Sequence, residues 1–120
     1  MADQKYFAKI KINPGTHLNA IVDESFIAPN TEVAMTRVHK WMSVLGINYS
    51  GPSGNTKVEL SSLQIEGQES AVEYNPFCIE VTPMEKLFFM EAADSVEKEL
   101  LQYGFKPENS GSGNFISSYR

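Results

Sequence analysis

The alternation of residue types between Lys5 and Ile12 is the feature that most constrains how this chain can fold. The apolar residues occupy every second position: Tyr6, Ala8, Ile10 and Ile12. Lys9 and Lys11 share the opposite phase with Phe7. Because successive side chains of a strand point to opposite sides of a sheet, this pattern predicts a strand with one buried face. The rest of the chain must supply further strands and a layer that covers that face.

Two segments are predicted to be helices that form this layer. The first begins after a cap at Asn30 or Thr31 and runs to about Leu45, where Gly46 is predicted to end it. Its apolar residues form a single stripe: Ala34, Val38, Trp41, Met42 and Leu45. We therefore expect this helix to lie on the sheet, with Trp41 and Met42 in the core.

The second helix has the clearest start signals. Thr82-Pro83-Met84-Glu85 combines a capping box with proline at the first helical position. Apolar residues follow at Leu87, Phe88, Phe89, Ala92, Ala93, Val96, Leu100 and Leu101. Gly104 is predicted to close the helix, and Phe105 to pack back over its last turn. Since Phe88 and Phe89 are adjacent, we expect one to pack on the sheet and the other on a loop or a partner subunit.

Four further segments read as strands. They cover residues 17–22, 57–65 with a bulge at Ser61-Ser62, 71–81 with an interruption at Asn75-Pro76, and 114–119. Residues 48–56 and 106–113 are expected to be loops, the first being either an ordinary surface loop or a rim of a site. The order β-β-α-β-β-α-β predicts an α+β two-layer sandwich, an antiparallel sheet with two helices and a ferredoxin-like core, in one domain over residues 1–120.

Composition excludes several functions. The net charge is −5 and the basic residues are scattered, which argues against general nucleic-acid binding. No apolar run approaches a membrane span, and the first residues lack the pattern of a signal peptide, so we expect a cytoplasmic protein. The single cysteine, Cys78, excludes a disulfide within the chain and is expected to be a small buried side chain.

Most enzymatic sites are also disfavoured. The two histidines and one cysteine do not have zinc-ligand spacing, and no cofactor motif is present, although a carboxylate magnesium site stays open. The glycine loops at residues 51–54 and 111–113 match neither the Walker nor the Rossmann pattern, but either could offer N–H groups to an anion. No Gly-x-Ser-x-Gly elbow is present, which disfavours nucleophilic hydrolysis.

His17 and Asn114 begin two short strand-like segments, and the chain from the first segment to the second reads strand, helix, strand, strand, helix, strand. In a strand, His17 and Asn19 face the same side, as do Asn114 and Ile116. This arrangement resembles the two-histidine (2H) phosphoesterase family, which includes 2′-5′ RNA ligase-like proteins and phage enzymes that cut cyclic-nucleotide signals. The similarity is strongest over residues 77–120, where a capped helix precedes Gly104-Phe105, a loop and the terminal segment.

The resemblance implies that the catalytic pair of the family is incomplete here. Carried over by position, His17 is the first catalytic histidine and Asn19 replaces the first Thr/Ser. Asn114 then replaces the second histidine and Ile116 the second Thr/Ser, and the chain is also short for the family. General acid–base catalysis needs one group to accept a proton and another to donate one, and asparagine does neither near neutral pH. The resemblance therefore implies a cleft that binds without cutting.

Two functions follow as hypotheses. The first is a non-catalytic protein that sequesters a nucleotide or another phosphorylated small molecule. Its candidate ligand-binding residues are His17, Asn19, Asn114 and Ser117. The second is a protein-interaction module, such as a small inhibitor or an assembly component of phage origin, in which His17 is merely a half-exposed strand residue. An enzyme with another site is a third reading, and a sheet edge near Pro76 or a spare helix face would suit a homo-oligomer.

Overall fold

The computed structural model describes residues 3–15, 19–49, 55–74 and 77–110 and has an α+β architecture. The elements in chain order are β1 (Gln4–Ile12), β2 (Ala20–Ala28), α1 (Thr31–Tyr49), β3 (Thr56–Ile65), β4 (Cys78–Val81), α2 (Pro83–Leu101) and the short 3₁₀ helix η1 (Pro107–Asn109). This order confirms the predicted sequence of the first six elements. The predicted strand at residues 114–119 lies outside the described residues.

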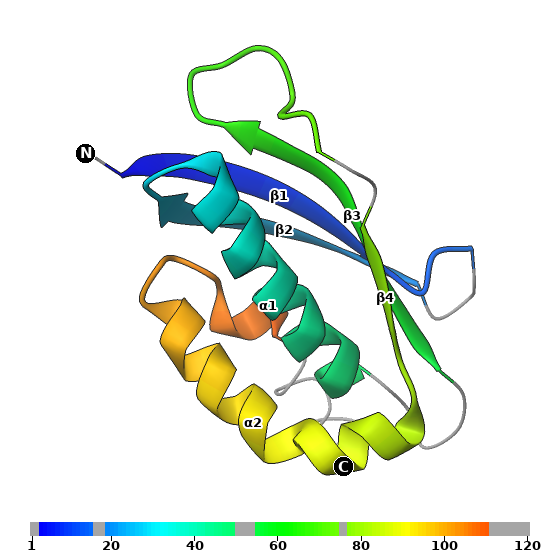
Figure 1. Cartoon of the computed structure of the whole chain (residues 1–120). Helices are drawn as coiled ribbons and strands as arrows, with labels where there is room; N and C mark the ends of the chain where they lie inside the picture. Colours follow the sequence, from blue (N-terminus) through cyan, green and yellow to red (C-terminus); the bar gives the residue numbers. More distant parts are fainter. Residues whose placement is uncertain (1–2, 16–18, 50–54, 75–76, 111–120) are drawn as a thin grey trace.

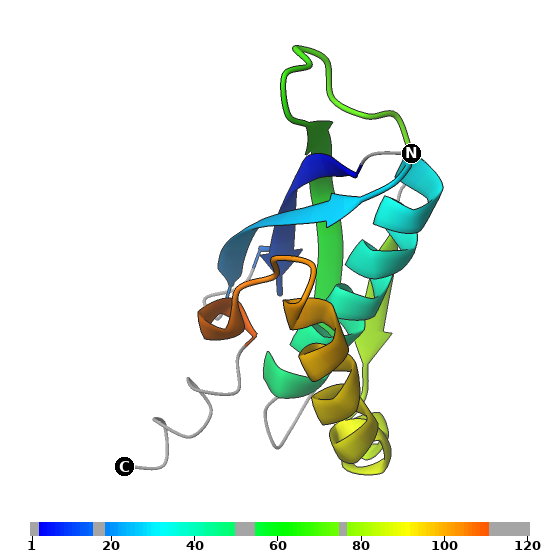
Figure 2. The ribbon, with the colours of Figure 1, turned by 90° about the vertical axis from the view of Figure 1, so that its left-hand side faces the viewer.

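The strands form one antiparallel sheet in the order β2-β1-β3-β4. Both helices lie on the same side of it, which gives the expected two-layer sandwich (Figures 1 and 2). Within the described residues no long helix covers the other sheet face, which we call the open face. α1 contacts all four strands, whereas α2 packs chiefly against α1. The second helix is therefore held at a distance from the sheet over much of its length.

The central strand β1 shows the predicted alternation. Tyr6, Ala8, Ile10 and Ile12 are buried, and the residues between them face the open side. β1 pairs with β2 on one side and with β3 on the other. The pairing with β3 shifts register between Lys9, opposite Ser62, and Ile10, opposite Leu60, so that Ser61 is the extra residue. The predicted bulge is confirmed.

Aromatic side chains occupy the centre of the core between the two layers. Trp41 of α1 and Phe26 of β2 both stack on Phe105, with ring centroids 4.9 and 4.6 Å away. Trp41 and Met42 are fully buried, as predicted. Phe105 does more than cover the last turn of α2, because its burial at 2% exposure anchors the following segment to β2. Gly104 permits this return with a φ of 111°, and an added Cβ would lie 3.0 Å from the backbone oxygen of Ser25.

Two boundaries differ from the prediction. Gly46 does not end α1, which continues to Tyr49. A Cβ on Gly46 would lie 2.6 Å from Cγ2 of Val81, so this glycine serves a close approach of helix and strand rather than a C-cap. β2 extends beyond residue 22 to Ala28, because Asp23, Glu24 and Ser25 interrupt the apolar pattern without interrupting the strand.

The prediction that Cys78 is buried was wrong. Among the described residues of the predicted strand 71–81, which leave out 75–76, β4 alone is a strand, and it lies at the sheet edge. Ile79 and Val81 point towards the helices, and Cys78 and Glu80 are exposed in the opposite phase. Side chains of a strand alternate between its two faces, so the phase of β4 determines that the thiol is exposed. The apolar residues next to Cys78 in the sequence do not indicate this phase.

Candidate functional site

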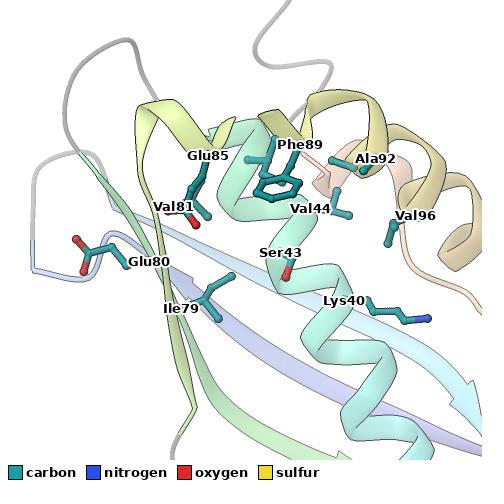
Figure 3. Close-up of a pocket in the computed structure, with 12 residues that line it drawn as sticks. Lys40, Ser43, Val44, Ile79, Glu80, Val81, Glu85, Phe89, Ala92 and Val96 are labelled. Carbon is teal, nitrogen blue, oxygen red and sulfur yellow. The ribbon is translucent and has the colours of Figure 1, made fainter. Parts of the chain in front are cut away.

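A largely apolar groove lies between α1, β4 and the N-terminal half of α2. Its volume is about 620 Å³, within the range of ligand sites in proteins. Its apolar walls include Val44, Ile47, Ile79, Val81, Phe89 and Val96. Figure 3 shows Val44, Val81 and Phe89 gathered near one end of the groove, with Lys40 at the other. The groove is open to solvent along α2.

The groove exists because α2 does not close against α1. Of the predicted apolar stripe on this helix, only Ala93 and Leu100 are buried. Ala92 and Ala93 supply short side chains opposite Ser43 and Val44 of α1, and all four line the groove. Leu100 is fully buried, so the C-terminal end of α2 joins the core while its N-terminal half leaves space.

The N-terminal half of α2 also presents apolar residues to solvent. We call these five side chains the α2 apolar surface: Met84 (68% exposed), Leu87 (76%), Phe88 (76%), Phe89 (50%) and Met90 (47%). Met84, Leu87 and Phe88 have the i, i+3, i+4 spacing of one helix face. The expectation that one phenylalanine of the pair packs on the sheet was wrong, since both are exposed. A helix that is apolar on several faces is typical of an element buried between two partners.

The N-terminus of α2 is held in place by local hydrogen bonds. The Glu85 backbone N–H donates to the Thr82 hydroxyl over 3.2 Å, and the Thr82 N–H donates to the Glu85 carboxylate over 3.0 Å. This confirms the predicted capping box. The exposed apolar residues of the first two turns are therefore displayed on a defined helix.

The charge around the α2 apolar surface is mainly negative. α2 carries five acidic residues and two lysines: Glu85, Glu91, Asp94, Glu97, Glu99, Lys86 and Lys98. Glu85 of α2 lines the groove, whereas the Glu80 carboxylate of β4 points away from it and accepts a hydrogen bond from Asn55 (Figure 3). Lys40, the lysine that lines the groove, forms a 3.5 Å ion pair with Glu99. A ligand that lies along α2 therefore meets a net negative rim.

Of the residues predicted to bind a ligand, the structure describes Asn19 alone. It is exposed and immediately precedes β2. His17, Asn114 and Ser117 lie outside the described residues, as do the glycine loops at 51–54 and 111–113. The binding of a nucleotide or phosphorylated molecule at these positions stays a prediction. The groove was not among the predicted sites, and the concentration of large apolar residues from 84 to 90 indicates the neighbouring α2 apolar surface instead, since of these residues Phe89 lines the groove.

Two other titratable groups serve the fold: His39, which is half-buried, and Glu24, which is buried. The His39 ring stacks on Phe77 with centroids 3.6 Å apart, and its Nε2 has no hydrogen-bond partner among the described residues. Burial lowers the pKa of His39, which favours its neutral form. Glu24 accepts hydrogen bonds from Trp41 and from the backbone of Lys106, both over 3.0 Å. Burial raises the pKa of Glu24, although these hydrogen bonds oppose the shift.

In the described part of the chain, no group of three or more His, Cys, Asp or Glu side chains is placed to hold a metal ion. Neither of its long helices has the apolar length needed to cross a membrane.

No protein-family model, no curated protein and no solved structure matches this chain. The resemblance to the 2H phosphoesterases, which include the 2′-5′ RNA ligase-like fold, therefore stays a prediction.

Proposed function

We propose that this chain is a protein-interaction module that binds an amphipathic helix with basic flanks from a partner protein. The observation that carries the proposal is the α2 apolar surface, which exposes five large side chains over the first two turns of one helix. Contiguous apolar patches on soluble proteins mark interaction sites, because leaving them in water costs free energy that a partner recovers.

The groove beside this surface suits a helical ligand. Helix-binding proteins receive anchors at i, i+3, i+4 and i+7 in an elongated apolar depression. Here the groove runs between two helices and is lined by Val44 and Ile47 on one wall and Phe89 and Val96 on the other. Anchors of the partner would enter the groove, and its neighbouring residues would cover Leu87 and Phe88.

Charge favours a basic partner over a second copy of this chain. A dimer formed through α2 would bring together two helices that each carry five acidic residues and two lysines. Lysines or arginines that flank the apolar anchors of a partner would instead lie near Glu85 and Glu91. Such complementarity mainly raises the association rate and selects the partner. We place this interaction in the cytoplasm, and a small inhibitor or an assembly component are the roles it fits.

The experiment uses two synthetic amphipathic peptides with the same leucine pattern, one with lysine and one with glutamate on the polar face. Binding of each fluorescently labelled peptide to the full chain is measured by anisotropy at low salt. We expect the lysine peptide to bind and the glutamate peptide to bind at least about tenfold more weakly. Equal binding of both peptides, or no binding of either, would contradict the proposal.

Variants locate the surface. Leu87→Gln and Phe88→Gln keep good helix propensity while removing apolar contact. Each should lower the affinity for the lysine peptide by about tenfold or more. Ile21→Gln is the matched control, since Ile21 is 60% exposed but lies on the open sheet face. Analytical ultracentrifugation measures the oligomeric state of the protein without peptide. If the protein is a dimer and Phe88→Gln converts it to a monomer, the α2 apolar surface binds a second copy of this chain instead.

A further inference from the structure

The open face of the sheet carries a row of basic residues on its central strand. Lys5, Phe7, Lys9 and Lys11 alternate with the buried residues of β1 and so share this face. Lys57 of β3 lies in the same phase. Four of the ten basic residues of the chain thus lie on this face, together with the exposed acids Asp23, Glu59 and Glu80 of the neighbouring strands. An anionic group is therefore suited only to a point on this face where lysine side chains converge.

A hollow of about 370 Å³ lies on this face. The strand register explains which residues meet there. Phe7 lies opposite Ser25 of β2 and Gln64 of β3, and Lys9 lies opposite Asp23 and Ser62. Directly opposite residues of neighbouring strands have Cβ atoms about 5 Å apart, so these six side chains form one contiguous site. All six line the hollow, and Lys106 lines it from beyond the edge of β2.

The two lysines of the hollow are placed to hold an anion. Among the described residues the ion pair is Lys40–Glu99, so Lys9 and Lys106 are not paired within that part of the chain. The Lys106 backbone N–H donates to the Glu24 carboxylate over 3.0 Å, which fixes this residue at the sheet edge. Glu24 also lines the hollow; burial raises the pKa of its carboxyl group, and its hydrogen bonds and the Lys106 charge oppose only part of that shift.

The other side chains suit an aromatic, hydroxyl-bearing ligand. Phe7 is 40% exposed, with the Lys5 Nζ 5.6 Å from its ring centroid, and offers a face on which a planar base can stack. Ser25 and Ser62 offer hydroxyl groups. The Gln64 Nε2 donates to the Glu69 carbonyl over 3.3 Å, which leaves its Oε1 to accept from a ligand. The Asp23 carboxylate is suited to accept hydrogen bonds from ribose hydroxyls.

We propose that this hollow binds a single nucleotide, with the base on Phe7 and the phosphate between Lys9 and Lys106. The site is separate from the α2 apolar surface and does not depend on the helix-binding function. It also differs from the predicted site at His17 and Asn114. A nucleic-acid strand fits less well than a mononucleotide, because Asp23 and Glu59 flank the central lysines on the neighbouring strands and would repel successive phosphates.

The proposal is tested by titrating the ¹⁵N-labelled full chain, in a phosphate-free buffer, with AMP, GMP, CMP and UMP. The corresponding nucleosides, inorganic phosphate and a short single-stranded oligonucleotide are titrated in parallel. At least one mononucleotide should shift the amide signals of β1, β2 and β3 around Phe7 and Lys9, and its nucleoside should bind at least about tenfold more weakly. Absence of binding by all four mononucleotides would overturn the proposal, as would tighter binding of the oligonucleotide.

Variants assign the two halves of the ligand. Lys9→Gln and Lys106→Gln should each lower the affinity for the mononucleotide by about tenfold and leave the affinity for the nucleoside unchanged. Phe7→Leu should weaken mononucleotide and nucleoside alike. The matched controls are Lys98→Gln and Phe88→Leu, which alter an exposed lysine and an exposed phenylalanine on α2. Equal effects of the control and site variants, or inorganic phosphate binding as tightly as the nucleotide, would contradict the assignment.

Discussion

The indole N–H of Trp41 in α1 donates a 3.0 Å hydrogen bond to the carboxylate of Glu24 in β2. Glu24 is 2% exposed, and its second oxygen accepts from the backbone N–H of Lys106, 82 residues further along the chain. One buried carboxylate thus joins the sheet, the first helix and the segment after the second helix. Two donors that would otherwise be buried without partners depend on it.

Replacing this carboxylate should destabilise the fold. Glu24→Gln keeps the shape of the side chain but offers one carbonyl oxygen where two N–H donors need acceptors, and it directs an amide N–H₂ at one of them. We expect the free energy of unfolding at neutral pH to fall by about 1–3 kcal/mol. Urea denaturation followed by Trp41 fluorescence measures this change. Glu59→Gln, on the open face of β3, is the control and should change stability by less than about 0.5 kcal/mol.

The pH dependence of the free energy of unfolding of wild type and Glu24→Gln tests the protonation of Glu24. Burial raises its pKa in the folded chain above the ordinary value of 4.5, so the folded state takes up a proton at a higher pH than the unfolded state. Stability then rises as pH falls through the folded pKa towards 4.5, because protonation removes the cost of burying a charge. Glutamine does not titrate, so the stability advantage of wild type over Glu24→Gln should grow over that window and level off below it. An advantage that shrinks would show a folded pKa below 4.5.

Gly46 should resist replacement although it lies within a helix. Alanine favours a helix by about 1 kcal/mol over glycine, so propensity alone predicts that Gly46→Ala stabilises α1. The added Cβ would however lie 2.6 Å from Cγ2 of Val81, and the β-branched valine has little freedom to move. We expect Gly46→Ala to be destabilising alone and less so in the background of Val81→Ala. A thermal double-mutant cycle measures this coupling, and additive effects would contradict the close contact.

The sequence predicted the architecture because the burial pattern of most elements has a clear period. Residues 5–12, the stripe of α1 and the capping box at Thr82 each indicate their element without tertiary information. The length of β2 could not be predicted, because Glu24 is a charged residue on the buried face and its partners come from Trp41 and Lys106. The sequence predicts Gly46 as a helix end, because glycine commonly ends helices. Its close approach to Val81 cannot be predicted from the neighbouring residues in the sequence.

The groove and the α2 apolar surface could not be predicted either, because they depend on how α2 packs. Leu87, Phe88 and Phe89 are typical of a core stripe, and only the packing of α2 shows that they remain uncovered. The open-face hollow depends on the register of three strands, which places Phe7 beside Ser25 and Gln64. Periodicity indicates that Phe7 and Lys9 share a face, but it does not indicate which residues of other strands lie next to them.

The two ends of α2 should respond differently to substitution. Leu87→Gln and Phe88→Gln remove side chains that are 76% exposed, so each should change the free energy of unfolding by less than about 0.5 kcal/mol. Leu100→Ala removes a fully buried side chain and should cost about 2–5 kcal/mol. Chemical denaturation of the three variants makes the comparison. A large loss of stability on replacing Phe88 would mean that this residue belongs to the core.

The thiol of Cys78 tests the placement of the edge strand β4. Cys78 is exposed, and Ile79 and Val81 of the same strand face the helices. In the native protein a thiol-specific reagent such as Ellman's reagent should therefore react with one cysteine at a rate close to that of the denatured chain, since no unfolding step is needed. Cys78→Ser should leave stability within about 0.5 kcal/mol of wild type. If the thiol reacts only after denaturant is added, the strand alternates in the opposite phase, and Cys78 instead of Ile79 faces the helix layer.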